Sequence, residues 1–182
     1  MQQPEPSMTV EDFLLWAEAR PGRHELVDGQ PHAMAPECVG HAEAKFAAQT
    51  ALRQAIVRAG VPCHMLPDGV TVRIDARTAY EPDALVYCGA RLSRNATVVA
   101  APVIVVEALS PSAGFFDRHG KLAGYFTLPS VQHYLIVDID RRMVIHHERD
   151  GDALRTRLLP SGPLRLDPPG LEVTVEDLLG PL

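Results

Sequence analysis

The sequence contains no apolar run long enough to cross a lipid bilayer. The longest run, residues 98–106, includes Pro102 and is far shorter than the roughly 20 residues that a membrane-spanning helix needs. The first residues also lack a basic segment followed by an apolar stretch, which is the pattern of a secretory signal peptide. These absences predict a cytoplasmic protein with no membrane partner.

Cysteine is scarce, and its spacing carries no known motif. Cys38, Cys63 and Cys88 are odd in number, lie far apart and form no CxxC pair. A disulfide framework or a four-thiolate zinc site is therefore not expected. Three reduced thiols fit a reducing compartment.

Lysine is scarcer still, because only Lys45 and Lys121 occur and arginine supplies the remaining positive charge. The formal net charge of −6 argues against a protein that coats nucleic acid, since affinity for phosphates depends on basic side chains. A nuclease remains compatible with this charge, because its acidic site is neutralised by bound metal. The sequence also lacks a glycine-rich phosphate loop, a dinucleotide fingerprint and a GxSxG elbow.

The 182 residues, of which 46% are hydrophobic and 22% charged, predict one domain over residues 9–182, preceded by a flexible leader at 1–8. The order of helical and strand patterns predicts an α/β fold, in which a central mixed β-sheet is flanked by helices and accompanied by an N-terminal helix and β-hairpin. Helices are expected at residues 9–19, 41–59, 117–128 and 175–179. Strands are expected as a hairpin at 24–28 and 30–34, as a meander at 63–66, 70–74 and 84–88, in the middle of the sheet at 103–109 and 131–138, and towards its edge at 143–147 and 154–159.

Two carboxylates stand out against this pattern. Glu107 is the one charge in the apolar strand 103–109, and Asp83 follows Pro82 directly before the strand at 84–88. Strand alternation would let both side chains converge at one sheet edge if the two strands are neighbours. The alternatives are an ion pair with an arginine for Glu107 and an ordinary turn for Asp83.

A pair of carboxylates at a sheet edge suits Mg²⁺ or Mn²⁺, which would polarise a phosphoryl oxygen and lower the pKa of a bound water. Lys121 could orient or help to deprotonate that water and offset charge in the transition state. Asp117 and Lys121 could equally form a solvent-exposed i,i+4 ion pair. His41, at the start of the long helix, could contact phosphate or support the metal, or could be a capping or core residue. His146 and His147 are adjacent on a strand and point to opposite faces, so they are not expected to share a metal.

Several short segments form a set in a fixed order along the chain. They are Glu25-Leu-Val-Asp-Gly29, Met34-Ala-Pro36 followed by His41, Pro82-Asp83, Val106-Glu-Ala-Leu-Ser-Pro111, Asp117 with Lys121 and Tyr125, and Tyr134-Leu-Ile-Val-Asp138. This set resembles the Uma-two family of restriction-endonuclease-like proteins, within the PD-(D/E)XK nuclease superfamily, and the similarity extends from Met8 to about Leu179.

The resemblance implies the restriction-endonuclease-like fold and a divalent-metal site. Asp83 and Glu107 match the two metal-binding acids, and Glu25 matches an additional acid from the early hairpin. The superfamily lysine usually lies two residues after the second acid, where this chain has Leu109. Lys121 resembles the migrated replacement that this family generally uses.

The leading hypothesis is an endonuclease that uses Mg²⁺ or Mn²⁺ to hydrolyse nucleic acid, with DNA as the expected substrate. A homodimer is expected, because two sites can then cut both strands. Two alternatives stay open. The acidic charge favours a catalytically silent module that binds nucleic acid or protein on the same fold. A hydrolase of small phosphoesters would use the same residues.

Overall fold

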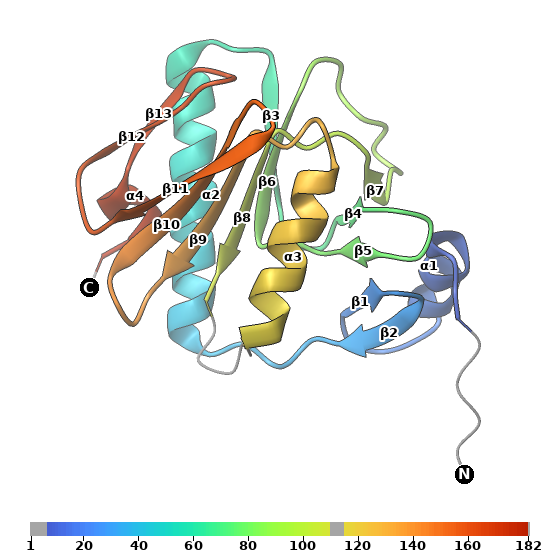
Figure 1. The fold of residues 1–182 in the computed structure, drawn as a ribbon. Coiled ribbons are helices and arrows are strands. Elements are labelled where there is room, and N and C mark those ends of the chain that lie inside the picture. The colour runs from blue at the N-terminus through green and yellow to red at the C-terminus, as the bar shows by residue number, and fades with distance from the viewer. Residues whose placement is uncertain (1–6, 110–114, 182) are drawn as a thin grey trace.

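The computed structural model describes residues 7–109 and 115–181, with side chains from residue 120 onward in the second segment. Its largest element is a six-stranded sheet with the strand order β11-β10-β9-β8-β6-β3 (Figure 1). Only β8 and β9 pair in parallel, so the sheet is mixed as predicted. Its strands are β3 (Cys63–Pro67), β6 (Ala84–Cys88), β8 (Ile104–Ala108), β9 (His133–Asp138), β10 (Met143–Asp150) and β11 (Ala153–Leu159).

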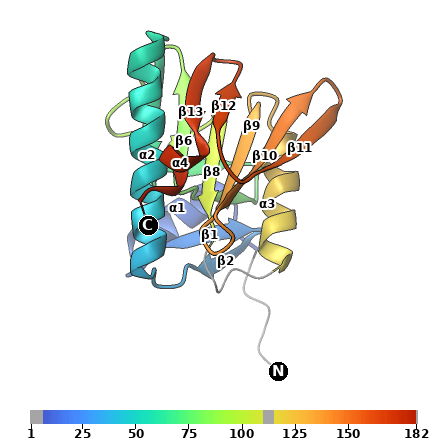
Figure 2. The same cartoon turned by 90° about the vertical axis from the view of Figure 1, so that its left-hand side faces the viewer.

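Helices cover both faces of this sheet. The long helix α2 (Val39–Ala59) lies on one side and α3 (Phe115–Thr127) on the other (Figure 2). On the side of α2, the hairpin of β12 (Pro163–Leu166) and β13 (Leu171–Thr174) and the short helix α4 (Val175–Leu179) complete the layer. Because both faces of the sheet are covered, the side chains on both faces of each central strand are apolar. This explains the continuous hydrophobic runs of these strands.

Close packing of α2 follows from its sequence. One face of the helix consists largely of alanines, and Ala44, Ala48, Ala51 and Ala55 are all buried against the sheet layer. Small side chains let the helix approach the strands closely. The helix ends at Gly60, which adopts the left-handed conformation with φ of 63° that favours glycine.

A second, five-stranded sheet lies beside the first, with the order β2-β1-β5-β4-β7. Its strands are β1 (His24–Val27), β2 (Gln30–Ala33), β4 (Thr71–Arg73), β5 (Ala79–Tyr80) and β7 (Val98–Val99), and α1 (Val10–Glu18) packs against it (Figure 1). The predicted N-cap Thr9 and hairpin turn are confirmed: Thr9 forms a capping box with Asp12, and Asp28 and Gly29 have positive φ. Within the segment 1–8 that was expected to be a flexible leader, Met8 is bonded to the hairpin turn: its backbone N–H donates to Gly29 O at 2.9 Å. Residues 1–6 lie outside the described residues.

The predicted meander is wrong. β3 pairs directly with β6, whereas β4 belongs to the second sheet, where it pairs with β5 and β7. Gly69, with φ of 96°, lies in the turn that redirects the chain. The strands β5 and β7 and the β12–β13 hairpin were not predicted, because strands of two to four residues are too short for alternation to be recognised.

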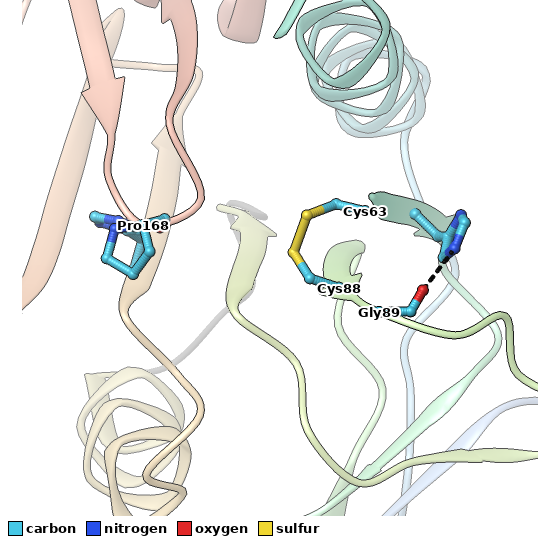
Figure 3. The surroundings of a disulfide bond; sticks show 6 residues. Cys63, Cys88, Gly89 and Pro168 are labelled. Carbon is cyan, nitrogen blue, oxygen red and sulfur yellow. Dashed lines mark hydrogen bonds between the residues drawn. A yellow bond between two sulfur atoms is a disulfide. The ribbon is translucent and has the colours of Figure 1, made fainter. Parts of the chain in front are cut away.

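The expectation of three reduced thiols is also wrong. Cys63 and Cys88 lie opposite each other on β3 and β6 and form a disulfide, with the ring of His64 next to Gly89 O at 3.2 Å (Figure 3). Cys38 is free and exposed. Sequence spacing could not show this pair, because it depends on the register of two antiparallel strands. Within the described residues, no helix is long and apolar enough to span a membrane.

The disulfide predicts a specific thiol count. Air-oxidised, denatured protein should show one reactive thiol before reduction and three after it, and the Cys38→Ser variant should show none before reduction. Reduction should lower the free energy of unfolding by up to about 3 kcal/mol, because the unfolded chain is no longer cross-linked. Thiol titration and denaturant unfolding measure both effects; three thiols in the oxidised sample would contradict the pairing.

Candidate functional site

The two carboxylates singled out in the sequence lie together at one end of the large sheet. β6 and β8 are antiparallel neighbours, with Ala84 opposite Val106, so Asp83 directly before β6 lies beside Glu107 near the end of β8. Asp83 is 4% exposed and its Oδ2 accepts a hydrogen bond of 2.7 Å from the backbone N–H of Ala108. The sheet therefore orients the first carboxylate through its own backbone.

Lys121 joins the second carboxylate to a third. Its ammonium donates to Glu107 Oε1 at 3.1 Å and to Glu25 Oε1 at 2.8 Å. Glu25 lies on β1 of the second sheet and also accepts from the backbone N–H of Glu81 at 2.8 Å. Three layers of the molecule thus meet at one buried ammonium group: α3, the large sheet and the small sheet.

Burial changes the acid–base behaviour of this cluster. It raises the pKa of Glu107 to about 8, although the Lys121 ammonium works in the opposite direction. For Lys121 burial opposes the charged form, but the carboxylates of Glu107 and Glu25 outweigh it and raise the pKa well above that of free lysine. Near neutral pH Lys121 therefore stays protonated, while a bound cation could replace the proton on Glu107.

Aromatic side chains close the site from the side of α3. The Tyr125 hydroxyl donates to Glu107 Oε1 at 2.9 Å, and the Tyr80 ring packs edge-on against Tyr125, with centroids 5.3 Å apart. A Cβ at Gly124 would lie 2.7 Å from the Tyr80 ring, so only glycine allows this approach. Tyr125 lies one helical turn after Lys121, a spacing that identifies it as a neighbour on the same helix face.

His41 lies on the other side of Asp83. Its Nε2 is 3.0 Å from Ala108 O and 3.5 Å from Asp83 Oδ2, while its buried Nδ1 has no hydrogen-bond partner and lies 3.6 Å from Glu37 Oε2. The hydrogen bond and charge of Asp83 raise the pKa of His41 despite burial. A nitrogen that faces a carboxylate at this distance favours a positive charge between them, either a proton or a metal ion.

The same region offers a group of metal-compatible ligands. Glu37, His41 and Asp83 each offer one ligand atom, and these three atoms lie within 4.8 Å of one another. No other such group occurs among the described side chains, which are those of residues 7–109 and 120–181. His146 and His147 have separate partners: His146 Nε2 lies 2.9 Å from His133 Nδ1, and His147 Nδ1 lies 2.8 Å from Thr156 Oγ1.

Lys45 is the residue that sequence reasoning underrated. Its buried ammonium lies 2.5 Å from Glu37 Oε1, 2.7 Å from Asp68 Oδ2 and 3.8 Å from Asp83 Oδ1. Arg23 contacts the same carboxylates of Glu37 and Asp68. Both lysines of the chain therefore lie at this site, one on each side of the Asp83–Glu107 pair. The signal was available, because Lys45 lies one turn after His41.

The remaining sequence candidate, Asp117, lies in α3, but its side chain falls outside the described residues, as do Ser110 and Pro111. The structure therefore gathers Glu25, His41, Asp83, Glu107 and Lys121 in one region. It adds residues that no motif indicated, among them Glu37, Asp68, Arg23 and Glu81.

Comparison with known proteins shows the family to which the sequence is similar. Residues 10–178 match the family described as "Uma2: Putative restriction endonuclease". The uncharacterized protein slr1290 of Synechocystis sp. is 31% identical over 179 residues, which covers 95% of this chain and 92% of that protein. A second uncharacterized Synechocystis protein, sll1609, is 39% identical over 54 residues, or 30% of each chain.

The architecture is also found in a solved structure. The crystal structure of "a putative nuclease belonging to DUF820" from Anabaena variabilis superposes with a TM-score of 0.74, covers 94% of this chain and 97% of that chain, and is 15% identical in sequence. At this identity the likeness shows the fold.

The buried ion triad predicts a pH-dependent loss of stability in Lys121→Met. At pH 8 without metal, its free energy of unfolding should fall by about 3–5 kcal/mol, since two carboxylates lose their cation in a buried site. The loss should shrink as the pH falls below about 8, because burial raises the pKa of Glu107 to about 8 and a protonated Glu107 no longer needs the cation.

The matched control is Arg165→Met, whose partner Asp167 lies at 3.0 Å but whose pair is 67% and 54% exposed. It should change stability by no more than about 1 kcal/mol. Equal losses in the two variants by denaturant unfolding, or a Lys121→Met loss that does not change with pH, would contradict this account.

Proposed function

This chain belongs to the Uma2 family and has the restriction-endonuclease-like fold, and from this premise we propose that it is a divalent-metal-dependent endonuclease. It would hydrolyse phosphodiester bonds of nucleic acid, with DNA as the favoured substrate. The observation that carries the proposal is the convergence of Glu25, Asp83, Glu107 and Lys121, from four separate segments of the chain, at one end of the central sheet.

The donor chemistry suits a hard divalent cation, because Asp83 and Glu107, with Glu25 on the far side of the Lys121 ammonium, offer the carboxylate oxygens that Mg²⁺ and Mn²⁺ prefer. As a group these three acids do not come within 4.8 Å of one another; among the described residues, Glu37, His41 and Asp83 do. The pKa of Glu107, raised to about 8 by burial, also indicates a site in which a positive charge is missing. When bound, such a cation would polarise a phosphoryl oxygen and lower the pKa of a coordinated water.

The chain's own residues would position the reactants. In the proposed mechanism Lys121 donates a hydrogen bond to the attacking water or to the phosphate, and its charge offsets the negative charge of the transition state. Its strongly raised pKa makes it a poor proton acceptor, so its role is orientation and electrostatic stabilisation. Ala108 N and Tyr125 hold the carboxylates of Asp83 and Glu107 in place.

His41 and Lys45 would act beside this centre. Both lie in the first two turns of α2 and both face Asp83. Positive charge on either residue would attract a phosphate to an otherwise acidic cluster. His41 could alternatively complete a second cation position with Glu37 and Asp83.

Cleavage assays test the proposal. Wild type with Mg²⁺ or Mn²⁺ should cut supercoiled plasmid or single-stranded oligonucleotides, and Glu107→Gln should lose at least about 100-fold in rate, since even outer-shell losses at metal sites cost about 10–100-fold. The control Asp167→Asn changes an exposed carboxylate outside the site and should keep wild-type activity.

Two results would reject the nuclease. Purified wild type that cleaves no DNA or RNA form with either metal would support a silent binding module. Turnover of a chromogenic phosphodiester without cleavage of any polymer would support a hydrolase of small phosphoesters.

Metal affinity should rise with pH. Because the pKa of Glu107 is about 8, a cation at this carboxylate must displace a proton below that pH. The Kd for Mn²⁺ should therefore fall by up to about tenfold per pH unit between pH 7 and 8 and level off above this range. Glu107→Gln should bind more weakly and with less pH dependence. Calorimetric titration measures both, and a pH-independent wild-type affinity would contradict the assignment of Glu107 as a ligand.

A further inference from the structure

The helix α2 has an outer face that nothing in the described chain covers. Val39, Phe46 and Val57 lie on this face and are 75%, 71% and 77% exposed. The opposite face of the same helix is buried on the sheet and includes His41 and Lys45. Large apolar side chains gathered on one exposed stripe indicate an interaction surface.

The spacing of this stripe is that of a helix-pairing seam. Its positions are 39, 43, 46, 50, 53 and 57, separated alternately by four and three residues, which keeps them on one side of an α-helix. We name these six residues the α2 stripe. They are Val39, Glu43, Phe46, Thr50, Arg53 and Val57.

The chemistry of the α2 stripe is symmetric about the level of residue 48. In an antiparallel copy centred at this level, Val39 faces Val57 of the other helix, and Phe46 faces Thr50. Glu43 likewise faces Arg53, so that opposite charges coincide. An antiparallel copy of the stripe is therefore complementary to the stripe itself, in apolar contacts and in charge.

Neither charge has a side-chain partner among the described residues. The Glu43 and Arg53 side chains form no hydrogen bond or ion pair with any residue in the part of the chain that the structure describes. They are ten residues apart on one helix, too far to reach each other. A second copy would supply each with its counter-charge, and two-fold symmetry would form the pair twice.

The shape of the surface also accommodates another helix. A groove of about 580 Å³ lies between α2 and the edge strand β3, and a second groove of about 680 Å³ lies between α2 and the C-terminal segment. Phe46 and Thr50 line both grooves, so they form the ridge between them. The Phe46 side chain of an antiparallel copy would lie beside Thr50, at the border of these grooves.

We propose that two copies of this chain associate through their α2 stripes, antiparallel, about a two-fold axis that crosses the stripe between Phe46 and Thr50. The interface is isologous, so every contact occurs twice. The alternating spacing of four and three residues corresponds to a crossing angle of about 20°. One helix pair buries less than the roughly 1,200 Å² of a stable interface, so self-association is expected in the micromolar range. The dimer does not depend on the proposed nuclease activity.

Sedimentation velocity of the full chain between about 1 µM and 100 µM tests the dimer. Wild type should convert from monomer to dimer over this range. Phe46→Asp should weaken association at least tenfold, while Leu158→Asp, at a similarly exposed position on β11 (61% exposed), should leave it unchanged. Circular dichroism and thermal unfolding would verify that each variant is folded, which its exposed position favours.

A charge exchange tests the register. Glu43→Arg and Arg53→Glu should each weaken association at least fivefold, because each places like charges opposite one another, and the double variant should restore it. A wild type that stays monomeric throughout, a dimer insensitive to Phe46→Asp, or a double variant weaker than both single variants would overturn the proposal.

Discussion

The contact on which the site depends is that of the Lys121 ammonium with Glu25 and Glu107. These carboxylates come from different sheets, and neither would remain buried and ionised without a cation close by. The lysine in turn keeps its charge only because both acids surround it. Helix α3 is therefore bound to both sheets through one charged group, and the place where the layers join is the place where the chemistry is proposed to occur.

The same arrangement leaves a shortage of positive charge. Asp83 and Glu107 are neighbours, and burial holds the pKa of Glu107 near 8 even with Lys121 next to it. On the far side of Asp83, Nδ1 of His41 has no hydrogen-bond partner and lies 3.6 Å from Glu37 Oε2. A region that gathers carboxylates and then lacks counter-charge is suited to take up a divalent cation and, with it, an anionic phosphate.

Helix α2 connects this site with the outside of the molecule. Its inner face carries His41 and Lys45 at the cluster, and its outer face carries the exposed α2 stripe. In the proposed dimer the two helices would be held against each other along that stripe. Two sites would then be related by symmetry, as suits an enzyme that cuts both strands of a duplex.

Local signals in the sequence determined much of the fold. The Thr9 capping box, the Asp28-Gly29 turn and the alanine-rich stretch of α2 each act within a few residues, so they could be interpreted without knowledge of the rest. Glu107 was likewise visible as a charge within an apolar strand. The approximate bounds of most helices and of the central strands followed from such patterns, as did the choice of Asp83, Glu107 and Lys121 as candidate site residues.

Tertiary structure alone decided which distant groups meet. The second sheet, the Cys63–Cys88 disulfide and the contact of Lys45 with Asp68 and Asp83 all depend on strand register or on the close approach of helix to sheet. So does the acidity of Glu107, because a pKa is set by burial and by charges brought near in space. These contacts depend on how distant segments pack against one another. No short sequence pattern shows which surfaces will be buried against each other.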